Sequence, residues 1–121
     1  MKKKIMIIEE DVIELNRLSL LLGFRGYEVC PLHRSYKVFT EITRCEPDII
    51  LLDAELSSMD SAVVSRALST MNQTRDIPVV MIAVEQGEEN ITYCIRKKGH
   101  NLTRRGDLDV MLDDLGLAMA S

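Results

Sequence analysis

The sequence lacks the features of a membrane protein, a zinc protein or a disulfide-rich domain. No apolar run approaches the roughly 18 residues that a membrane-spanning helix needs. The basic residues 2–4 are followed only by the apolar run 5–8, whereas a secretory signal needs roughly 7–15 apolar residues. The three cysteines, Cys30, Cys45 and Cys94, are far apart and form no CxxC pair, so we expect reduced thiols in a cytoplasmic domain.

The sequence also lacks an excess of positive charge, because 19 acidic residues against 15 basic ones give a formal net charge of −4. An excess of negative charge argues against bulk electrostatic affinity for nucleic acid. No glycine-rich phosphate loop follows any apolar run, and no nucleophile–base pair is visible. We therefore expect a domain that binds neither nucleic acid nor a membrane and that is not an enzyme.

The chain does contain enough apolar residues for one hydrophobic core. Apolar residues make up 46% of its 121 residues, which fits a single domain over residues 1–121. Most of its short apolar runs are continuous, as in strands that are buried on both faces of a parallel sheet. These runs are Ile5–Ile8, Tyr27–Cys30, Ile49–Leu52 and Val79–Ala83.

Longer stretches of helical period lie between these runs. Glu14 stands three residues after Asp11, which predicts a capping box at the first helix. Alternating elements of this kind predict an α/β fold, a single (βα)5 doubly wound parallel sheet with the flavodoxin-like strand order 2-1-3-4-5. The other expected elements are helices over 35–44 and 88–98, helices after Asp60 and Asp107, and a weakly apolar fifth strand at His100–Thr103.

Two of the apolar runs end in carboxylates. Glu9 and Glu10 follow the first run, and Asp53 follows the third. The carboxyl ends of these two strands should meet at one edge of the sheet, at the point where such folds bind ligands. Clustered carboxylates repel one another unless a cation intervenes, and oxygen ligands of this kind suit Mg²⁺. A single acid at a strand end more often caps the next helix, but two such strands favour a site.

The sequence resembles the receiver domains of response regulators in two-component signalling. The segments that carry the resemblance are 5–11, Pro47–Asp53, Met59–Asp60 and Ile77–Met81. By this resemblance Asp53 is the phosphoacceptor, and Glu9 and Glu10 are the acidic pair. Glu10 would be the direct Mg²⁺ ligand, with Asp53 and the backbone carbonyl of Glu55 as further ligands. The resemblance also implies a phosphorelay in which a histidine kinase supplies the phosphoryl group.

Several positions depart from the pattern of this family. Glu10 stands where aspartate is usual, and its extra methylene shifts a carboxylate in a kind of site that is sensitive to about 1 Å. Ala83 replaces a Thr or Ser, and its methyl group cannot donate a hydrogen bond to a phosphoryl group. Arg104 replaces the lysine, and we expect it at the acidic edge, where it neutralises the carboxylates. Ser61 replaces a glycine.

These departures favour an atypical receiver domain that acts as a protein-interaction module, with impaired or altered phosphorylation switching at Asp53. Its expected partner is a histidine kinase or an output domain, and a homodimer is expected to use the fourth helix, fifth strand and fifth helix. One alternative is a conventional Mg²⁺-dependent phospho-accepting receiver. Another is a flavodoxin-like small-molecule-binding protein, which the missing glycine-rich loop disfavours.

Overall fold

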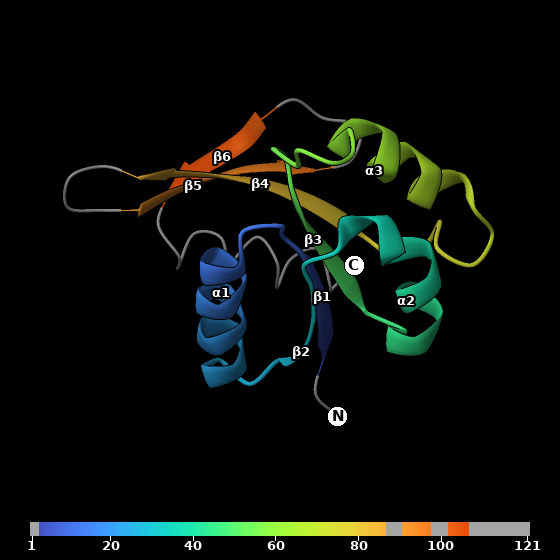
Figure 1. Cartoon of the computed structure of the whole chain (residues 1–121), viewed down its shortest axis with the longest axis horizontal. Helices are drawn as coiled ribbons and strands as arrows, with labels where there is room; N and C mark the ends of the chain where they lie inside the picture. The colour runs from blue at the N-terminus through green and yellow to red at the C-terminus, as the bar shows by residue number, and fades with distance from the viewer. Residues whose placement is uncertain (1–2, 87–90, 98–101, 107–121) are drawn as a thin grey trace.

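A computed structural model describes the backbone of residues 3–86, 91–97 and 102–106. Over these ranges the chain forms one six-stranded sheet with the strand order β2-β1-β3-β4-β5-β6 (Figure 1). The strands are β1 (Lys4–Ile8), β2 (Glu28–Leu32), β3 (Ile49–Asp53), β4 (Val79–Gln86), β5 (Ile91–Lys97) and β6 (Leu102–Gly106).

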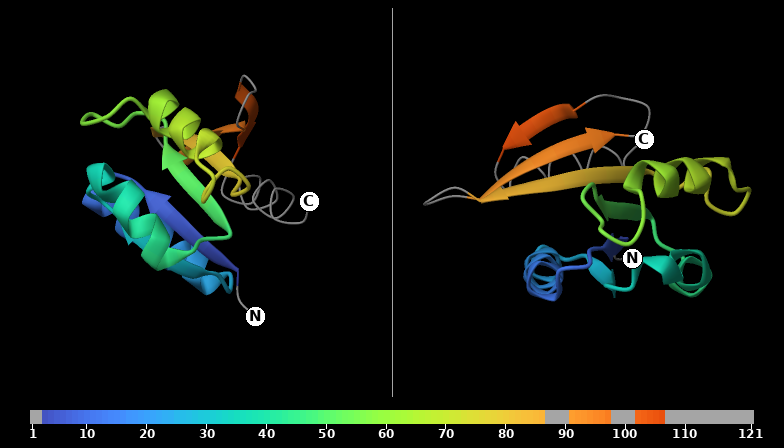
Figure 2. Two further views of the ribbon diagram at one scale, coloured as in Figure 1. Left: turned by 90° about the vertical axis from the view of Figure 1, so that its right-hand side faces the viewer. Right: turned by 45° about the horizontal axis from the view of Figure 1, so that its top comes forward.

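The first four strands form a parallel sheet that is covered on both faces. β1 pairs with β2 and β3, and β3 pairs with β4, all in parallel. Helix α1 lies on one face, and α2 and α3 lie on the other (Figures 1 and 2). This arrangement confirms the predicted doubly wound α/β class with flavodoxin-like order. The helical elements are α1 (Val12–Phe24), the short 3₁₀ helix η1 (Ser35–Lys37), α2 (Val38–Cys45) and α3 (Ser61–Thr70).

Successive residues of the central strands enter two separate cores. In β1, Ile5 and Ile7 pack against α1, whereas Met6 and Ile8 pack against α2 and α3. Side chains alternate across a strand, so a strand that is covered on both faces must be apolar at every position. All four side chains are at most 1% exposed, which explains the continuous apolar runs in the sequence. Within the described ranges, no helix is both long and apolar enough to span a bilayer.

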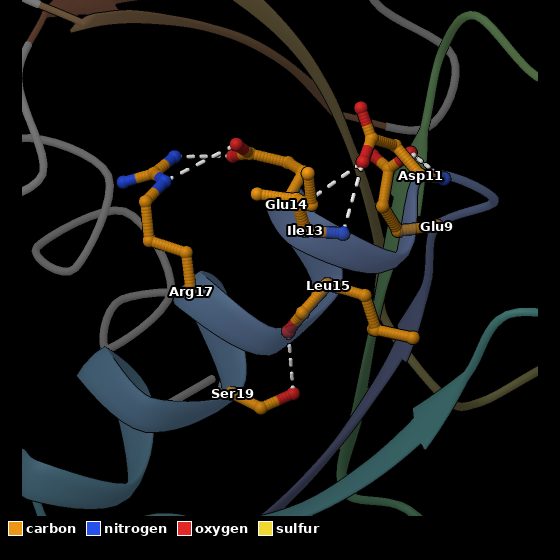
Figure 3. Close-up of polar contacts among 7 residues, drawn as sticks. All are labelled: Glu9, Asp11, Ile13, Glu14, Leu15, Arg17 and Ser19. Carbon is orange, nitrogen blue, oxygen red and sulfur yellow. Dashed lines mark hydrogen bonds and ion pairs between the residues drawn. The ribbon is translucent and has the colours of Figure 1, made fainter.

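Helix α1 begins as predicted, but without a capping box. The Asp11 side chain accepts hydrogen bonds from the backbone N–H groups of Ile13 (3.0 Å) and Glu14 (3.3 Å). The Glu14 carboxylate forms an ion pair with Arg17 and does not accept a hydrogen bond from the Asp11 N–H (Figure 3). The Asp11 N–H donates to the Glu9 carboxylate instead, at 3.0 Å. The capping-box prediction is therefore wrong, because a guanidinium one turn along the helix offers Glu14 a charged partner.

Helix α3 is capped by Asp60, as the sequence predicts. Its Oδ1 accepts hydrogen bonds from the N–H groups of Ala62 (2.9 Å) and Val63 (3.4 Å). We expect Asp60→Ala to lower the free energy of unfolding by about 1 kcal/mol, because two N–H groups lose their acceptor. Urea denaturation measures this change. Asp60→Ser is the matched control, since serine keeps a capping oxygen, and an equal loss in both variants would contradict the capping role.

The second half of the sheet differs from the prediction. The helix expected over 88–98 is wrong, because β5 occupies Ile91–Lys97 and runs antiparallel to β4. β-branched and aromatic side chains alternate along this segment at Ile91, Tyr93 and Ile95, and this period of two favours a strand. The fifth strand expected at His100–Thr103 only overlaps β6, which is antiparallel to β5. The helix expected after Asp107 lies outside the described residues.

The cysteines also depart from the expectation of reduced thiols. Cys30 of β2 and Cys45 at the end of α2 form a disulfide, with their Cα atoms 6.4 Å apart. Their sequence separation of 15 residues carries no sign of this pairing. It arises because α2 packs across β1 and brings its last residue to the neighbouring edge strand, within the Cα distance that a disulfide requires.

Candidate functional site

The predicted acidic residues line one cavity at the carboxyl ends of β1 and β3. These strands pair in parallel register, with Ile8 opposite Leu52, so the residues that follow them are neighbours. The cavity has a volume of ≈ 760 Å³. Its acidic lining residues are Glu9, Glu10, Asp11, Glu14, Asp53 and Glu55.

Glu9 is a buried carboxyl group that pairs with Asp53. Its residue surface is 5% exposed, and its side chain hydrogen-bonds the Asp53 carboxylate. Burial, then the hydrogen bond to Asp53 and the negative charges of Asp53 and Glu14, raise the pKa of Glu9 from 4.5 to about 8, against the lowering effect of the Asp11 N–H. At neutral pH Glu9 therefore holds a proton and donates it in the hydrogen bond to Asp53.

Glu10 points elsewhere, although it is the next residue in the chain. Its Oε1 accepts hydrogen bonds from the Ser57 N–H (2.6 Å), the Ser57 hydroxyl (3.1 Å) and the Ser58 N–H (3.3 Å). Its Oε2 accepts from the hydroxyl groups of Ser58 and Ser35, the latter at 3.0 Å. Both carboxylate oxygens are thus already occupied by donors. We call Ser35, Ser57 and Ser58 the serine clamp.

The serine clamp keeps Glu10 ionised. Its hydrogen bonds, that of the Ser58 side chain foremost, lower the pKa of Glu10 from 4.5 to about 2. The clamp also joins three parts of the chain, because Ser35 begins η1, Ser57 and Ser58 lie between β3 and α3, and Glu10 follows β1. The hydroxyl oxygens of Ser35 and Ser58 lie 2.7 Å apart, so one hydroxyl proton can bridge the two serines in place of its bond to Glu10. Glu10 therefore acts as an anchor for two loops.

Asp53 is half-buried at the end of β3 and borders the cavity. Its Oδ1 accepts a hydrogen bond from the Glu55 N–H at 2.9 Å. Its backbone carbonyl accepts a second one from the Ser61 hydroxyl at 2.6 Å. Ser61 is the first residue of α3, so this bond joins the start of that helix to the acceptor strand. The Asp53 carboxylate is thereby held in place while it faces the cavity.

The carboxylates of the predicted Mg²⁺ site are hydrogen-bonded to neighbouring groups in this structure. The cavity offers oxygen ligands of the right chemistry, and both Glu10 oxygens accept hydrogen bonds from the serine clamp. Among the residues that the structure describes, no group of three or more His, Cys, Asp or Glu side chains is arranged to hold a metal ion. Binding of Mg²⁺ through Glu9, Glu10, Asp53 and Glu55 stays a prediction.

The two predicted switch positions lie at different distances from Asp53. Ala83 of β4 follows Ile82, the register partner of Asp53, and so lies beside the acceptor strand. Asp53 is the register partner of Ile82, which pairs with Ile95, which in turn pairs with Arg104 of β6. Three strand spacings therefore separate Arg104 from Asp53. Its backbone is therefore about 14 Å from β3 across the sheet. The register does not bring Arg104 next to Asp53, and its role at the acidic edge stays a prediction.

The serine clamp is the part of the site that sequence reasoning missed. Serines are common in loops and carry no motif, so only the pair Ser57-Ser58 after the acceptor strand offered a signal. Ser61 was noted as a substitution, but its bond to the Asp53 carbonyl follows from the position of α3.

Comparison with known proteins identifies the domain, although no protein-family model matches the chain. The transcriptional regulatory protein KdpE of Staphylococcus aureus is 32% identical over 95 residues, which are 78% of this chain and 40% of KdpE. The polar-differentiation response regulator DivK of Brucella anthropi is 27% identical, covering 75% of this chain and 76% of DivK. The chain thus spans less than half of KdpE.

Solved structures agree on the fold. The N-terminal domain of the nisin resistance regulator NsrR superimposes with a TM-score of 0.71 at 21% identity, covering 98% of this chain and 99% of that domain. The parallel sheet, the carboxylates at its edge and these similarities agree. The chain therefore belongs to the receiver domains of response regulators in two-component signalling.

Proposed function

We propose that this receiver domain acts as a protein-interaction module in phosphorelay signal transduction, with impaired phosphorylation switching at Asp53. The observation that carries the proposal is the position of Glu10, whose two carboxylate oxygens are bound by the serine clamp. A carboxylate that is held on two loops is not available to bind a cation beside Asp53. Phosphoryl transfer depends on neutralising charge at the acceptor, so the reaction at Asp53 should be slow.

The hydrogen bond from Glu9 has a second effect on the acceptor. A carboxylate that accepts a proton-bearing partner carries less negative charge on its oxygens and is a weaker nucleophile. Asp53 accepts both from Glu9 and from the Glu55 N–H, so two of its acceptor positions are in use. An attack by the oxygen that Glu9 contacts would therefore have to break the hydrogen bond between Glu9 and Asp53.

The conformational response to phosphorylation also lacks a hydrogen-bond donor, at position 83. Ala83 has no hydroxyl to bind a phosphoryl group on Asp53. A modification shifts a conformational equilibrium only if it makes different contacts in the two states. Without that contact, the effect of phosphorylation should remain near Asp53 and not spread along β4.

The partners follow from the family. KdpE and the DNA-binding dual master transcriptional regulator RpaA of Synechocystis are, by name, regulators of transcription, and this chain covers 40% and 46% of them. We propose a histidine kinase or an output domain as the partner, a cytoplasmic location and no enzymatic turnover. The homodimer face was predicted from a fourth helix that is instead β5, so dimerisation rests on no contact described here.

Phosphorylation of the intact protein tests the proposal. We expect that Mg²⁺ and acetyl phosphate label the wild-type chain slowly, and that Ser58→Ala labels about tenfold faster. The loss of one charge-assisted hydrogen bond of about 1.5 kcal/mol frees Glu10 by that factor. Intact-mass measurement over time follows the label, and Asp53→Asn is the control that should take up none.

Amide chemical shifts distinguish the conventional receiver from the atypical one. In the phosphorylated or beryllofluoride-treated protein, we expect shift changes confined to residues around Asp53. Rapid and complete labelling of the wild type, with changes that spread through β4 and β5, would instead establish the conventional Mg²⁺-dependent receiver.

A further inference from the structure

A disulfide site lies between β2 and α2, away from the acidic cavity. Cys30 lies in the edge strand β2, and Cys45 is the last residue of α2. Their disulfide joins the sheet to the helix that covers it. A cavity of ≈ 250 Å³ borders both cysteines, together with the ion pair of the half-buried Glu41 and the exposed Arg44. Both cysteine residues therefore line the same cavity.

The two cysteines differ in their access to solvent. Cys45 is 7% exposed, whereas Cys30 is half-buried. Thiol–disulfide exchange requires that one sulfur be reached by an attacking thiolate, and disulfides with such access are the labile ones. Cys30 is the less buried of the two residues, so we assign it as the cysteine that is attacked first and Cys45 as the resolving cysteine.

We propose that Cys30 and Cys45 form a reversible redox pair that exchanges with low-molecular-weight disulfides of the glutathione class. In the forward direction the Cys30 thiolate attacks oxidised glutathione, forms a mixed disulfide and releases one glutathione thiolate. The Cys45 thiolate then attacks the Cys30 sulfur and releases the second glutathione. Two cysteine thiols are thereby oxidised, one glutathione disulfide is reduced to two thiols, and the reverse reaction reopens the pair.

The loop that this disulfide closes contains Ser35, a member of the serine clamp. Ser35 lies between the two cysteines in sequence, and its hydroxyl donates to Glu10 at 3.0 Å. A crosslink restricts the conformations of the loop it closes. The oxidised pair therefore keeps Ser35 against Glu10, and reduction loosens this arm of the clamp. This link depends on the contact between Ser35 and Glu10 and not on phosphorylation of Asp53.

Thiol counting on the full chain tests the redox pair. The Cys94→Ser variant is used because it removes the third thiol. It is equilibrated in buffers with a series of ratios of reduced to oxidised glutathione and then quenched in acid. Free thiols are alkylated and counted by mass spectrometry. We expect two alkylated thiols in reducing buffer, none in oxidising buffer, and full recovery of both on return to reducing buffer. Two alkylated thiols in every buffer, or a disulfide that never reopens, overturns the proposal.

Amide hydrogen exchange tests the link to the clamp. We expect exchange over residues 33–37 to become about tenfold faster on reduction, with no change in α3. The Cys30→Ser/Cys45→Ser double variant should show the fast exchange in both buffers, which separates the disulfide from other effects of the reductant. Equal exchange in the oxidised and reduced wild type would overturn the link between the pair and Ser35.

Discussion

The stability of this domain should fall as the pH rises from about 5 to about 8, and Glu9→Gln should remove most of that fall. The pKa of Glu9 is raised from 4.5 to about 8 in the folded protein, chiefly by burial and then by Asp53. Between these two values the folded state holds a proton that the unfolded state has released. Protons therefore favour the folded state in this window, and their removal destabilises it.

The effect of Glu9 should be large. A shift from 4.5 to about 8 sets an upper limit of about 5 kcal/mol, and we expect about 3 kcal/mol because water can enter the open cavity when Glu9 ionises. Glutamine keeps a donor for Asp53 and does not titrate. Urea denaturation at several pH values measures the slope, which should be nearly flat in Glu9→Gln.

The neighbouring residue provides the control for this prediction. Glu10→Gln should keep the slope between pH 5 and 8, because the pKa of Glu10 lies far below that window. If Glu10→Gln flattened the slope as much as Glu9→Gln, the contact between Glu9 and Asp53 would not be its source.

Glu10→Gln should lower the stability at neutral pH by about 2 kcal/mol. Hydrogen bonds to a charged group contribute about 1.5–3 kcal/mol, and the partial exposure of Glu10 places its effect in the lower part of that range. Glutamine keeps one acceptor oxygen, loses the other, and has no charge to strengthen the bonds of the serine clamp.

The pH dependence of Glu10 should have the opposite sign to that of Glu9. The pKa of Glu10 is lowered from 4.5 to about 2, so the unfolded state takes up its proton first as the pH falls. The stabilisation from Glu10 is complete above about pH 4.5 and is lost as the pH falls through about 2. The difference between wild type and Glu10→Gln should therefore shrink in acid.

A double-mutant cycle checks that the serine clamp causes this effect. Ser58 and Glu10 contact each other. The double variant should therefore lose less free energy of unfolding than the sum of the losses in Ser58→Ala and Glu10→Gln. Asp60→Ala, which acts at the start of α3, is the matched comparison and should be additive with Glu10→Gln. Additive losses for Ser58 and Glu10 would contradict the clamp.

Much of the fold could be predicted from the sequence, because the pattern of apolar residues indicates which positions are buried. Continuous apolar runs predicted β1, β3 and β4, and Asp11 and Asp60 predicted the starts of α1 and α3. It failed over residues 88–98, where charged residues obscured the alternation of β5. A short segment with both helical and strand signals is decided by its neighbour, and here β4 extends to Gln86 and offers a full edge for pairing.

The sequence by itself determined that Glu9, Glu10 and Asp53 come together, because parallel strands bring their carboxyl ends to the same edge. It did not determine that Glu9 pairs with Asp53 while Glu10 turns to the serine clamp. Glu9 and Glu10 follow the end of β1, and the chain bends at Glu10, so strand alternation does not fix where the two side chains point. Glu9 faces Asp53 and Glu10 faces the three serines because of the way η1 and the loop before α3 pack. The tertiary structure thus makes one of two adjacent glutamates a neutral acid and the other a fixed anion, because one is buried beside a charge and the other is surrounded by donors.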